Sequence, residues 1–251
     1  MKTVVSRYGK TILLVLAMVF LYELLTDVFA ILDSVIFPGL SRVFPALIFS
    51  LPELVKGLGS SLQKLLPAYG LALALGISVG LYVGERENLR KILMPIFNGL
   101  SPIPATLYTT YAITLFPTFS SASSFIIFIG CLWPILNGTI SGVYLIDKHY
   151  INNAKILELK GFTKIRKVIF PGALPIILNG AKSALNSSFL LLIVAEMFGA
   201  DSGLGYFVQY YSDFSKFDRV LAGMIFMSAF IILIMQAFEM LRSYLLRWRN
   251  I

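Results

Sequence analysis

Six long apolar windows run through the sequence and restrict its possible folds more than any other feature. Each has about the 20 residues that an α-helix needs to cross the hydrocarbon core of a bilayer. Hydrophobic residues make up 57% of the 251 residues, more than soluble domains usually contain. The chain is therefore expected to be an all-α integral membrane protein with six transmembrane helices. The windows cover residues 11–31, 62–84, 92–116, 122–146, 174–198 and 220–243.

The basic residues indicate how these helices are oriented. Fifteen of the 21 Lys and Arg residues fall on one side of the six-helix arrangement, four fall on the other, and two lie within windows. Cytoplasmic loops carry the excess of Lys and Arg, so both termini are expected in the cytoplasm. The same asymmetry accounts for the net charge of +8 without a nucleic-acid partner. Glu23, Asp27 and the lack of a clear cleavage site favour a retained first helix over a signal peptide.

A charged stretch, NNAKILELKGFTKIRKVIFPGALP at residues 152–175, separates the fourth window from the fifth. Asn152 or Asn153 can cap a short helix there, and Gly161 can end it in a left-handed turn. Leu157 belongs to a small apolar patch beside the lysines. The pattern fits either a solvated loop or a short helix that binds the groove of a cytoplasmic partner.

Three glycines of the second window, Gly76, Gly80 and Gly84, recur every four residues and share one helical face. Small residues at this spacing let two membrane helices approach closely. A packing seam is therefore expected at these positions rather than contact with a substrate.

Polar residues line one face of the fifth window, where Asn179, Ser183 and Asn186 follow one another at helical spacing. Polar groups are costly against lipid, so this face is expected to turn toward a water-filled path or toward another helix. The third window is interrupted by Pro102 and Pro104. Such interruptions are tolerated inside protein or beside water.

Two charged residues of the fifth window, Lys182 and Glu196, need partners because an unpaired charge inside a membrane is expensive. An anionic substrate, Glu23, Asp27 or a backbone carbonyl could each pair with Lys182. Glu196 is expected to stabilise a gate through a hydrogen bond to the loop that follows it, with direct substrate contact as the alternative.

No arrangement of side chains in the sequence indicates catalysis or metal binding. The fragment Gly9-Lys10-Thr11 resembles the end of a phosphate-binding loop, but Val4 occupies the position where such a loop needs glycine. The chain is therefore not expected to be an enzyme or to bind a cofactor, and any ATP it uses must be hydrolysed by another protein.

The stretch after the charged insert carries a more specific pattern. Residues 168–205 read VIFPGALPIILNGAKSALNSSFLLLIVAEMFGADSGLG, which includes Ala195-Glu196-Met197 and Gly203-Leu204-Gly205. They resemble the nitrate/sulfonate/taurine branch of the permeases of bacterial ABC importers, and the likeness extends over about residues 60–248. The family's cytoplasmic motif is matched in spacing, although Asn152 stands where Glu is usual and Glu158 where Gly is usual.

The resemblance implies a type I importer permease in a prokaryotic plasma (inner) membrane. Residues 1–58 would hold the first helix and an external connection, and residues 59–248 the permease core with a coupling helix near 152–161. The implied partners are a second permease copy or paralogue, two ATPase subunits that bind ATP and Mg, an extracytoplasmic substrate-binding protein and membrane lipid. The implied ATPase-coupling residues are Asn152, Asn153, Ala154, Leu157, Glu158 and Gly161. The implied path or gate residues are Asn179, Lys182, Ser183, Asn186 and Glu196.

The resemblance leaves the solute open, because it implies either a nitrate-, sulfonate- or taurine-like anion or a thiamine precursor or flavin. Two other function classes compete with the importer permease. An ion-coupled secondary transporter often shows internal repeats and acidic groups at the membrane midplane, and the two halves of this sequence are not similar. The third possible function is a non-transporting membrane scaffold, and only the polar helix faces argue against it.

Overall fold

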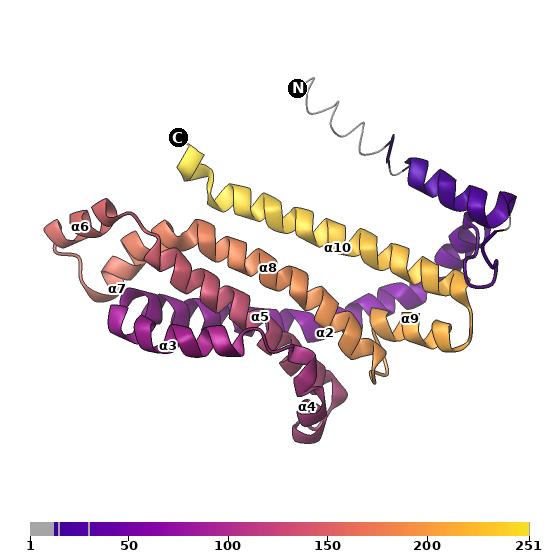
Figure 1. The fold of residues 1–251 in the computed structure, drawn as a ribbon, viewed down its shortest axis with the longest axis horizontal. Coiled ribbons are helices and arrows are strands. Elements are labelled where there is room, and N and C mark those ends of the chain that lie inside the picture. Colours follow the sequence, from indigo (N-terminus) through magenta and orange to yellow (C-terminus); the bar gives the residue numbers. More distant parts are fainter. Residues whose placement is uncertain (1–12, 15, 30, 251) are drawn as a thin grey trace.

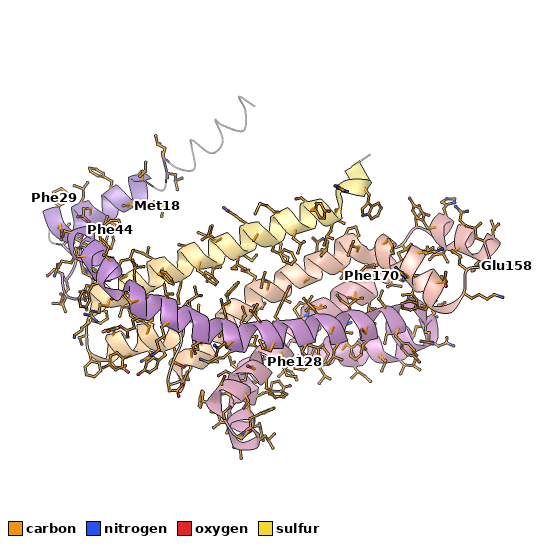
Figure 2. The ribbon with its side chains drawn as sticks, turned by 180° about the vertical axis from the view of Figure 1, so that it is seen from behind. Met18, Phe29, Phe44, Phe128, Glu158 and Phe170 are labelled. Carbon is orange, nitrogen blue, oxygen red and sulfur yellow. The ribbon has the colours of Figure 1, made fainter. Side chains whose placement is uncertain are left out.

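The computed structural model describes residues 13–250 except positions 15 and 30, and this part of the chain is helical without strands. Long helices run along the same axis, with α6 and α7 at one end of the molecule and α9 at the other (Figure 1). Glu158 and Phe29 lie at these opposite ends (Figure 2). The elements are η1 (Leu24–Val28), α2 (Leu40–Glu85), α3 (Glu87–Leu100), η2 (Ala105–Tyr108), α4 (Thr109–Leu115), α5 (Phe119–Tyr144), α6 (Lys148–Ile156), α7 (Gly161–Lys164), η3 (Ile165–Ile169), α8 (Phe170–Met197), α9 (Leu204–Asp213), α10 (Phe217–Leu245) and η4 (Arg247–Asn250).

Four helices in the described part of the chain are long and apolar enough to cross a membrane. They are Leu40–Glu85, Phe119–Tyr144, Gly161–Met197 and Phe217–Leu245. The first predicted window begins outside the described residues, and its residues 16–23 are helical and continue into η1. The third predicted window is divided among α3, η2 and α4 instead of forming one spanning helix.

Helix α2 is much longer than the second window predicts. It contains 46 residues, and at 1.5 Å per residue it extends about 69 Å, roughly twice the thickness of a bilayer core. Pro45, Pro52 and Pro67 lie inside it. The expected boundary between residues 58 and 59 therefore falls within a continuous helix, and the expected external connection forms its first part.

The three glycines of α2 lie where this helix contacts α5. A Cβ atom on Gly76 would lie 2.8 Å from the side chain of Ile135, and one on Gly80 would lie 2.5 Å from Cβ of Thr139. A Cβ atom on Gly84 would lie 2.8 Å from Cβ of Val143. These spacings are shorter than van der Waals contact, so α2 can approach α5 this closely only without side chains at the three positions.

Helix α5 is also in close contact with α8 on its other side. A Cβ atom on Gly138 would lie 3.0 Å from Cα of Gly180, and one on Gly142 would lie 3.0 Å from the carbonyl oxygen of Ala173. Because α5 is tightly packed between α2 and α8, it cannot move away from one without pressing on the other. These three helices form the rigid frame that positions the candidate sites.

Candidate functional site

The polar residues of α8 share a face that no other part of the described chain covers. Asn179, Ser183 and Asn186 are all exposed, as is Leu190 on the same side. The opposite sides of α8 pack against its neighbours, for example through the hydrogen bond from Tyr69 Oη to the Ala181 carbonyl at 2.8 Å. The polar face is thus available to a second chain or to water.

Lys182 lies at the edge of this face and pairs with α10. Its Nζ is 2.8 Å from Oε2 of Glu239, and Arg242 donates to Oε1 of the same carboxylate at 2.9 Å. Both side chains of the Lys182 pair are about half-exposed. The expected pairing of Lys182 with Glu23 or Asp27 is wrong, because these two carboxylates accept hydrogen bonds from the Leu40 N–H and the Ser41 hydroxyl at the start of α2.

The break in the third window lies beside α8 and near the middle of α5. Ala105 is buried among core residues, and a Cβ atom on Gly130 would lie 3.4 Å from Ala105 and 2.1 Å from Leu191. Gly130 is roughly central in α5. From there the segment projects away from the bundle (Figure 1) and exposes Leu107 and Tyr111. Irregular backbone at this depth needs protein or water around it rather than lipid.

Helix α6 occupies the position of the predicted coupling helix but begins four residues earlier. Its N-cap is Asp147, whose carboxylate accepts the His149 N–H at 2.9 Å. The predicted caps Asn152 and Asn153 are therefore wrong, because both lie inside the helix. Since Asp147 satisfies a free N–H group upstream, the helix has already formed before it reaches them.

The end of α6 also differs from the prediction. Glu158 adopts the left-handed conformation with φ of 51°, its N–H donates to the Lys155 carbonyl, and Leu159 N–H donates to the Ala154 carbonyl. This is the Schellman arrangement, which usually has glycine at the left-handed position. Gly161 has φ of 55° but begins α7 instead of ending α6. Glu158 thus occupies a position at which glycine is preferred.

The apolar residues of α6 are presented to the outside of the described chain. Ile156 and Leu157 are 78% and 68% exposed, whereas Ala154 is buried. Leu157 also lines a groove of about 530 Å³ that extends between α6 and the start of α8. Behind α6, Lys164 forms an ion pair with Glu85 at 3.1 Å, which connects α7 to the end of α2. Helix α6 is thus attached through its buried Ala154 and followed by an anchored α7, and its end presents an apolar surface to the outside of the described chain.

At the opposite end of the bundle, Glu196 is fully buried and paired. Its carboxylate accepts a hydrogen bond from the Ser61 hydroxyl at 2.8 Å, from Lys64 Nζ at 3.0 Å and from the Gly205 N–H at 2.9 Å. Lys64 Nζ also donates to the Ser202 carbonyl at 2.6 Å. We call the side chains of Ser61, Lys64 and Glu196, together with the backbone of residues 202–205, the outer clasp.

The glycines of the Gly203-Leu204-Gly205 stretch are explained by the outer clasp. Gly203 has φ of 130°, and a Cβ atom there would lie 2.2 Å from the Glu196 carboxylate. A Cβ atom on Gly205 would lie 2.6 Å from the Ile193 carbonyl oxygen. The loop can approach the carboxylate only because both positions lack side chains.

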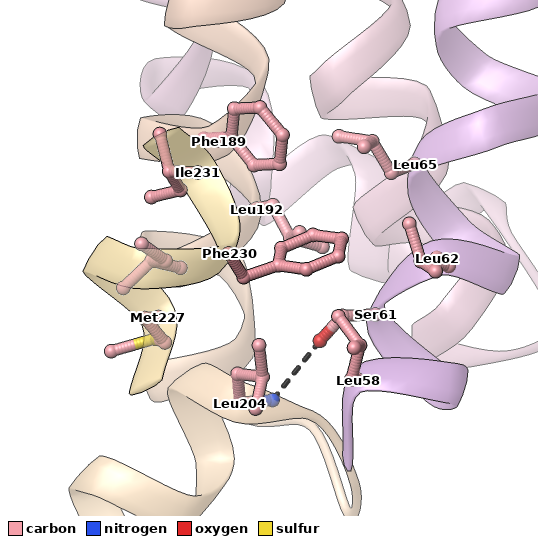
Figure 3. A pocket seen from close by; sticks show the side chains of 11 residues that line it. Leu58, Ser61, Leu62, Leu65, Phe189, Leu192, Leu204, Met227, Phe230 and Ile231 are labelled. Atoms are coloured by element: carbon pink, nitrogen blue, oxygen red, sulfur yellow. Dashed lines mark hydrogen bonds between the residues drawn. The ribbon is translucent and has the colours of Figure 1, made fainter. Parts of the chain in front are cut away.

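A small cavity of about 20 Å³ lies next to the outer clasp (Figure 3). Figure 3 shows the bond from Leu204 N–H to the Ser61 hydroxyl, 3.0 Å long, with Leu58, Leu62 and Phe230 around it. The lining is apolar apart from Ser61. The space is large enough for one water molecule and too small for a solute such as a sulfonate.

Helix α9 is attached at its other end by a second polar group. Tyr211 Oη donates to Glu53 at 2.9 Å, and Arg219 on α10 donates to the same phenol oxygen. Burial raises the pKa of Tyr211, and the hydrogen bond to Glu53 raises it further, so the phenol remains a donor. Tyr210 and Phe214 are exposed on α9. The helix presents aromatic side chains outward while both of its ends are attached to the bundle.

Sequence reasoning missed Lys64 and Ser61 as partners of Glu196. The available signal was that Lys64 and Glu196 are isolated charges within apolar windows, and two such charges satisfy each other at least cost. The two residues are separated by 132 positions, so only the folded arrangement of α2 against α8 shows which charges meet.

Comparisons with known proteins agree with this arrangement. Residues 72–249 match the family described as binding-protein-dependent transport system inner membrane component. A nitrate import permease protein of Leptolyngbya laminosa is 32% identical over 66% of this chain and 60% of that protein. A putative aliphatic sulfonates transport permease protein of Bacillus subtilis is 31% identical over 79% of this chain and 72% of that protein. A bicarbonate transport system permease protein of Synechococcus elongatus is 31% identical over 75% of this chain and 68% of that protein.

Among solved structures, a chain of the inward-facing MetNI methionine ABC transporter has the same fold. The two superpose with a TM-score of 0.66 at 19% identity, covering 78% of this chain and 97% of that one. The chain spans less than two thirds of the Leptolyngbya permease, although the family match covers most of its own length. The fold and the family match together show that the chain belongs to the binding-protein-dependent transport system inner membrane components.

Proposed function

We propose that the chain is the permease subunit of an ATP-driven importer and forms the path for a small solute together with a second permease copy or paralogue. The observation that carries the proposal is the exposed polar face of α8, Asn179, Ser183 and Asn186, beside the mid-depth break at Ala105. Both features are unfavourable against lipid and favourable along a watery path.

The inner end supports coupling to a separate ATPase that binds ATP and Mg. Helix α6 buries Ala154 against the chain and exposes Ile156 and the adjoining Leu157, and the Lys164–Glu85 pair anchors the neighbouring α7 to α2. An amphipathic helix of this kind fits an apolar groove on a partner. With α6 in the cytoplasm, both termini would also lie there, and the exposed aromatic residues of α9 would face an extracytoplasmic substrate-binding protein.

The solute is proposed to be a small anion. The relatives described above are named for nitrate, aliphatic sulfonates and bicarbonate. In this chain, two cations, Lys182 and Arg242, share the single carboxylate of Glu239 beside the polar face. The resulting excess of positive charge favours an anion nearby.

Cysteine accessibility tests the path assignment. Ser183→Cys and, as a control, Ile232→Cys on α10 are both exposed positions, whereas the native Cys131 is buried. In the assembled transporter in vesicles, a membrane-impermeant thiol reagent is expected to modify position 183 and block ATP-driven uptake, while position 232 stays unreactive in lipid. Equal protection of both positions would contradict a watery path along α8.

A further inference from the structure

We propose that Lys64 is a positioning residue, and that the outer clasp holds α9 in one orientation against α2 and α8. The inference rests on the proposed function, because α9 is the helix proposed to face the binding protein. Lys64 and Glu196 are 4% and 0% exposed at their side chains, so the pair is shielded from solvent.

The cost of this pair indicates that it does more than add stability. A buried ion pair loses the solvation of both charges. Apolar residues of similar size in its place often stabilise a fold to the same extent or more. What apolar packing cannot provide is direction. Hydrogen bonds have preferred distances and angles, so they can fix the orientation of a helix that apolar contacts alone would leave free to rock.

Each charge of the outer clasp also faces a backbone group of the loop that complements its sign. The Lys64 ammonium donates to the Ser202 carbonyl, and the Glu196 carboxylate accepts the Gly205 N–H. An exchange of the two charges would keep the ion pair but bring a carboxylate to the carbonyl and an ammonium to the N–H group. The loop therefore distinguishes this arrangement of the charges from its reverse.

Ser61 completes the attachment without a charge. Its hydroxyl donates to Glu196 and accepts the Leu204 N–H at 3.0 Å. Leu204 is the first residue of α9, so this bond acts on the start of the helix. The other end of α9 is attached by Tyr211 to Glu53. Loss of the outer clasp should thus allow α9 to tilt about its far end without detaching.

Distances between spin labels measure this tilt directly. Nitroxide labels at Leu75→Cys on α2 and Tyr206→Cys in the first turn of α9 report this tilt, because Tyr206 lies at the end of α9 that the outer clasp would release. Leu75 is exposed, Tyr206 is partly exposed, and the native Cys131 is buried. The full-length chain is assembled with its partner subunits in a bilayer and diluted with unlabelled chain. Double electron–electron resonance then gives the distance distribution within one protomer.

Four variants in this labelled background separate the possibilities. Lys64→Met/Glu196→Leu removes both charges, Lys64→Glu/Glu196→Lys reverses them, and Ser61→Ala removes only the hydroxyl. Lys91→Met is the matched control, because it removes an exposed ion pair with Glu87 on α3, far from α9.

The parent and Lys91→Met are expected to give one narrow distribution, the two double variants a broadened one, and Ser61→Ala an intermediate width. A narrow distribution in the neutral double variant would overturn the proposal. Recovery of the parental width in the reversed variant would also overturn it, since an ion pair of either polarity would then suffice. If the double variants do not assemble, a parental width in Ser61→Ala would contradict it.

A functional readout accompanies the distances. The ratio of ATP hydrolysis with and without the loaded binding protein should fall in Ser61→Ala and stay at the parental value in Lys91→Met. An unchanged ratio in a variant with a broadened distribution would show that the orientation of α9 has no effect on signalling. A parent without any stimulation would refute the proposed function, while the distance result would still decide whether the outer clasp positions α9.

Discussion

Substitution of Gly80 by alanine is expected to destabilise the bundle because it places a methyl group inside the contact between α2 and α5. The new Cβ atom would lie 2.5 Å from Cβ of Thr139 and 3.2 Å from the Leu136 carbonyl oxygen. Carbon atoms pack favourably at about 3.5–4.0 Å, so the helices would have to separate by about 1 Å. Rotation of the Thr139 side chain cannot relieve this contact, because the position of its Cβ is fixed by the backbone of α5.

The size of the effect follows from the rigidity of α5. Helix α5 cannot recede, since a Cβ on Gly138 would already lie 3.0 Å from Gly180 on α8. Overpacking of this kind costs about 1–3 kcal/mol. Gly70→Ala is the matched control, because it makes the same chemical change in the same helix with no atom within 4 Å of the new Cβ. The gain in helix propensity is common to both variants and cancels between them.

The assay compares the free energies of unfolding of both variants in mixed micelles titrated with a denaturing detergent. Gly80→Ala is expected to unfold at lower detergent fraction than Gly70→Ala, with a difference of about 1–3 kcal/mol. Equal stabilities would refute the view that the glycines of α2 form a packing seam.

Three further changes test other parts of the account. Leu157→Asp is expected to weaken ATPase association and uncouple transport without loss of membrane insertion, whereas Phe162→Asp, exposed to a similar degree (75% against 68%), should leave association intact in a pull-down. Glu158→Gly should raise the thermal midpoint, because a left-handed residue other than glycine costs about 1–2 kcal/mol, and Glu158→Ala should not. Gly203→Ala should lower the midpoint more than Gly59→Ala, since only Gly203 has a left-handed φ and a carboxylate within reach of the new Cβ.

The sequence predicts the last three helices well and the second and third windows less well, since window 220–243 lies within α10 whereas window 92–116 is divided among α3, η2 and α4. Windows 122–146 and 174–198 correspond closely to α5 and α8, because their apolar runs end at turn-forming residues. The predicted start of the second helix was too late, since Pro45 and Pro52 suggest breaks. A helix tolerates such prolines when neighbouring elements and solvent satisfy the freed backbone groups.

Some features of the candidate sites can likewise be predicted from the sequence, and others cannot. The face of Asn179, Ser183 and Asn186 follows from helical spacing alone, because residues three and four apart share a side. The expected acidic partners of Lys182, Glu23 and Asp27, were wrong, because only the packing of α8 beside α10 brings Glu239 within reach of the lysine. The caps of α6 were misplaced because Asp147 and the two asparagines are all good N-caps, and the first one in the chain starts the helix.

We expect this chain to move a solute only when a separate ATPase subunit hydrolyses ATP. The direct measurement is solute uptake into vesicles that contain the chain, its ATPase and its binding protein, with nitrate, a short sulfonate and bicarbonate offered in turn. Uptake is expected to require ATP on the side of α6 and to be absent when a proton or sodium gradient replaces ATP. Uptake driven by an ion gradient without ATP would contradict the account and identify a secondary transporter instead.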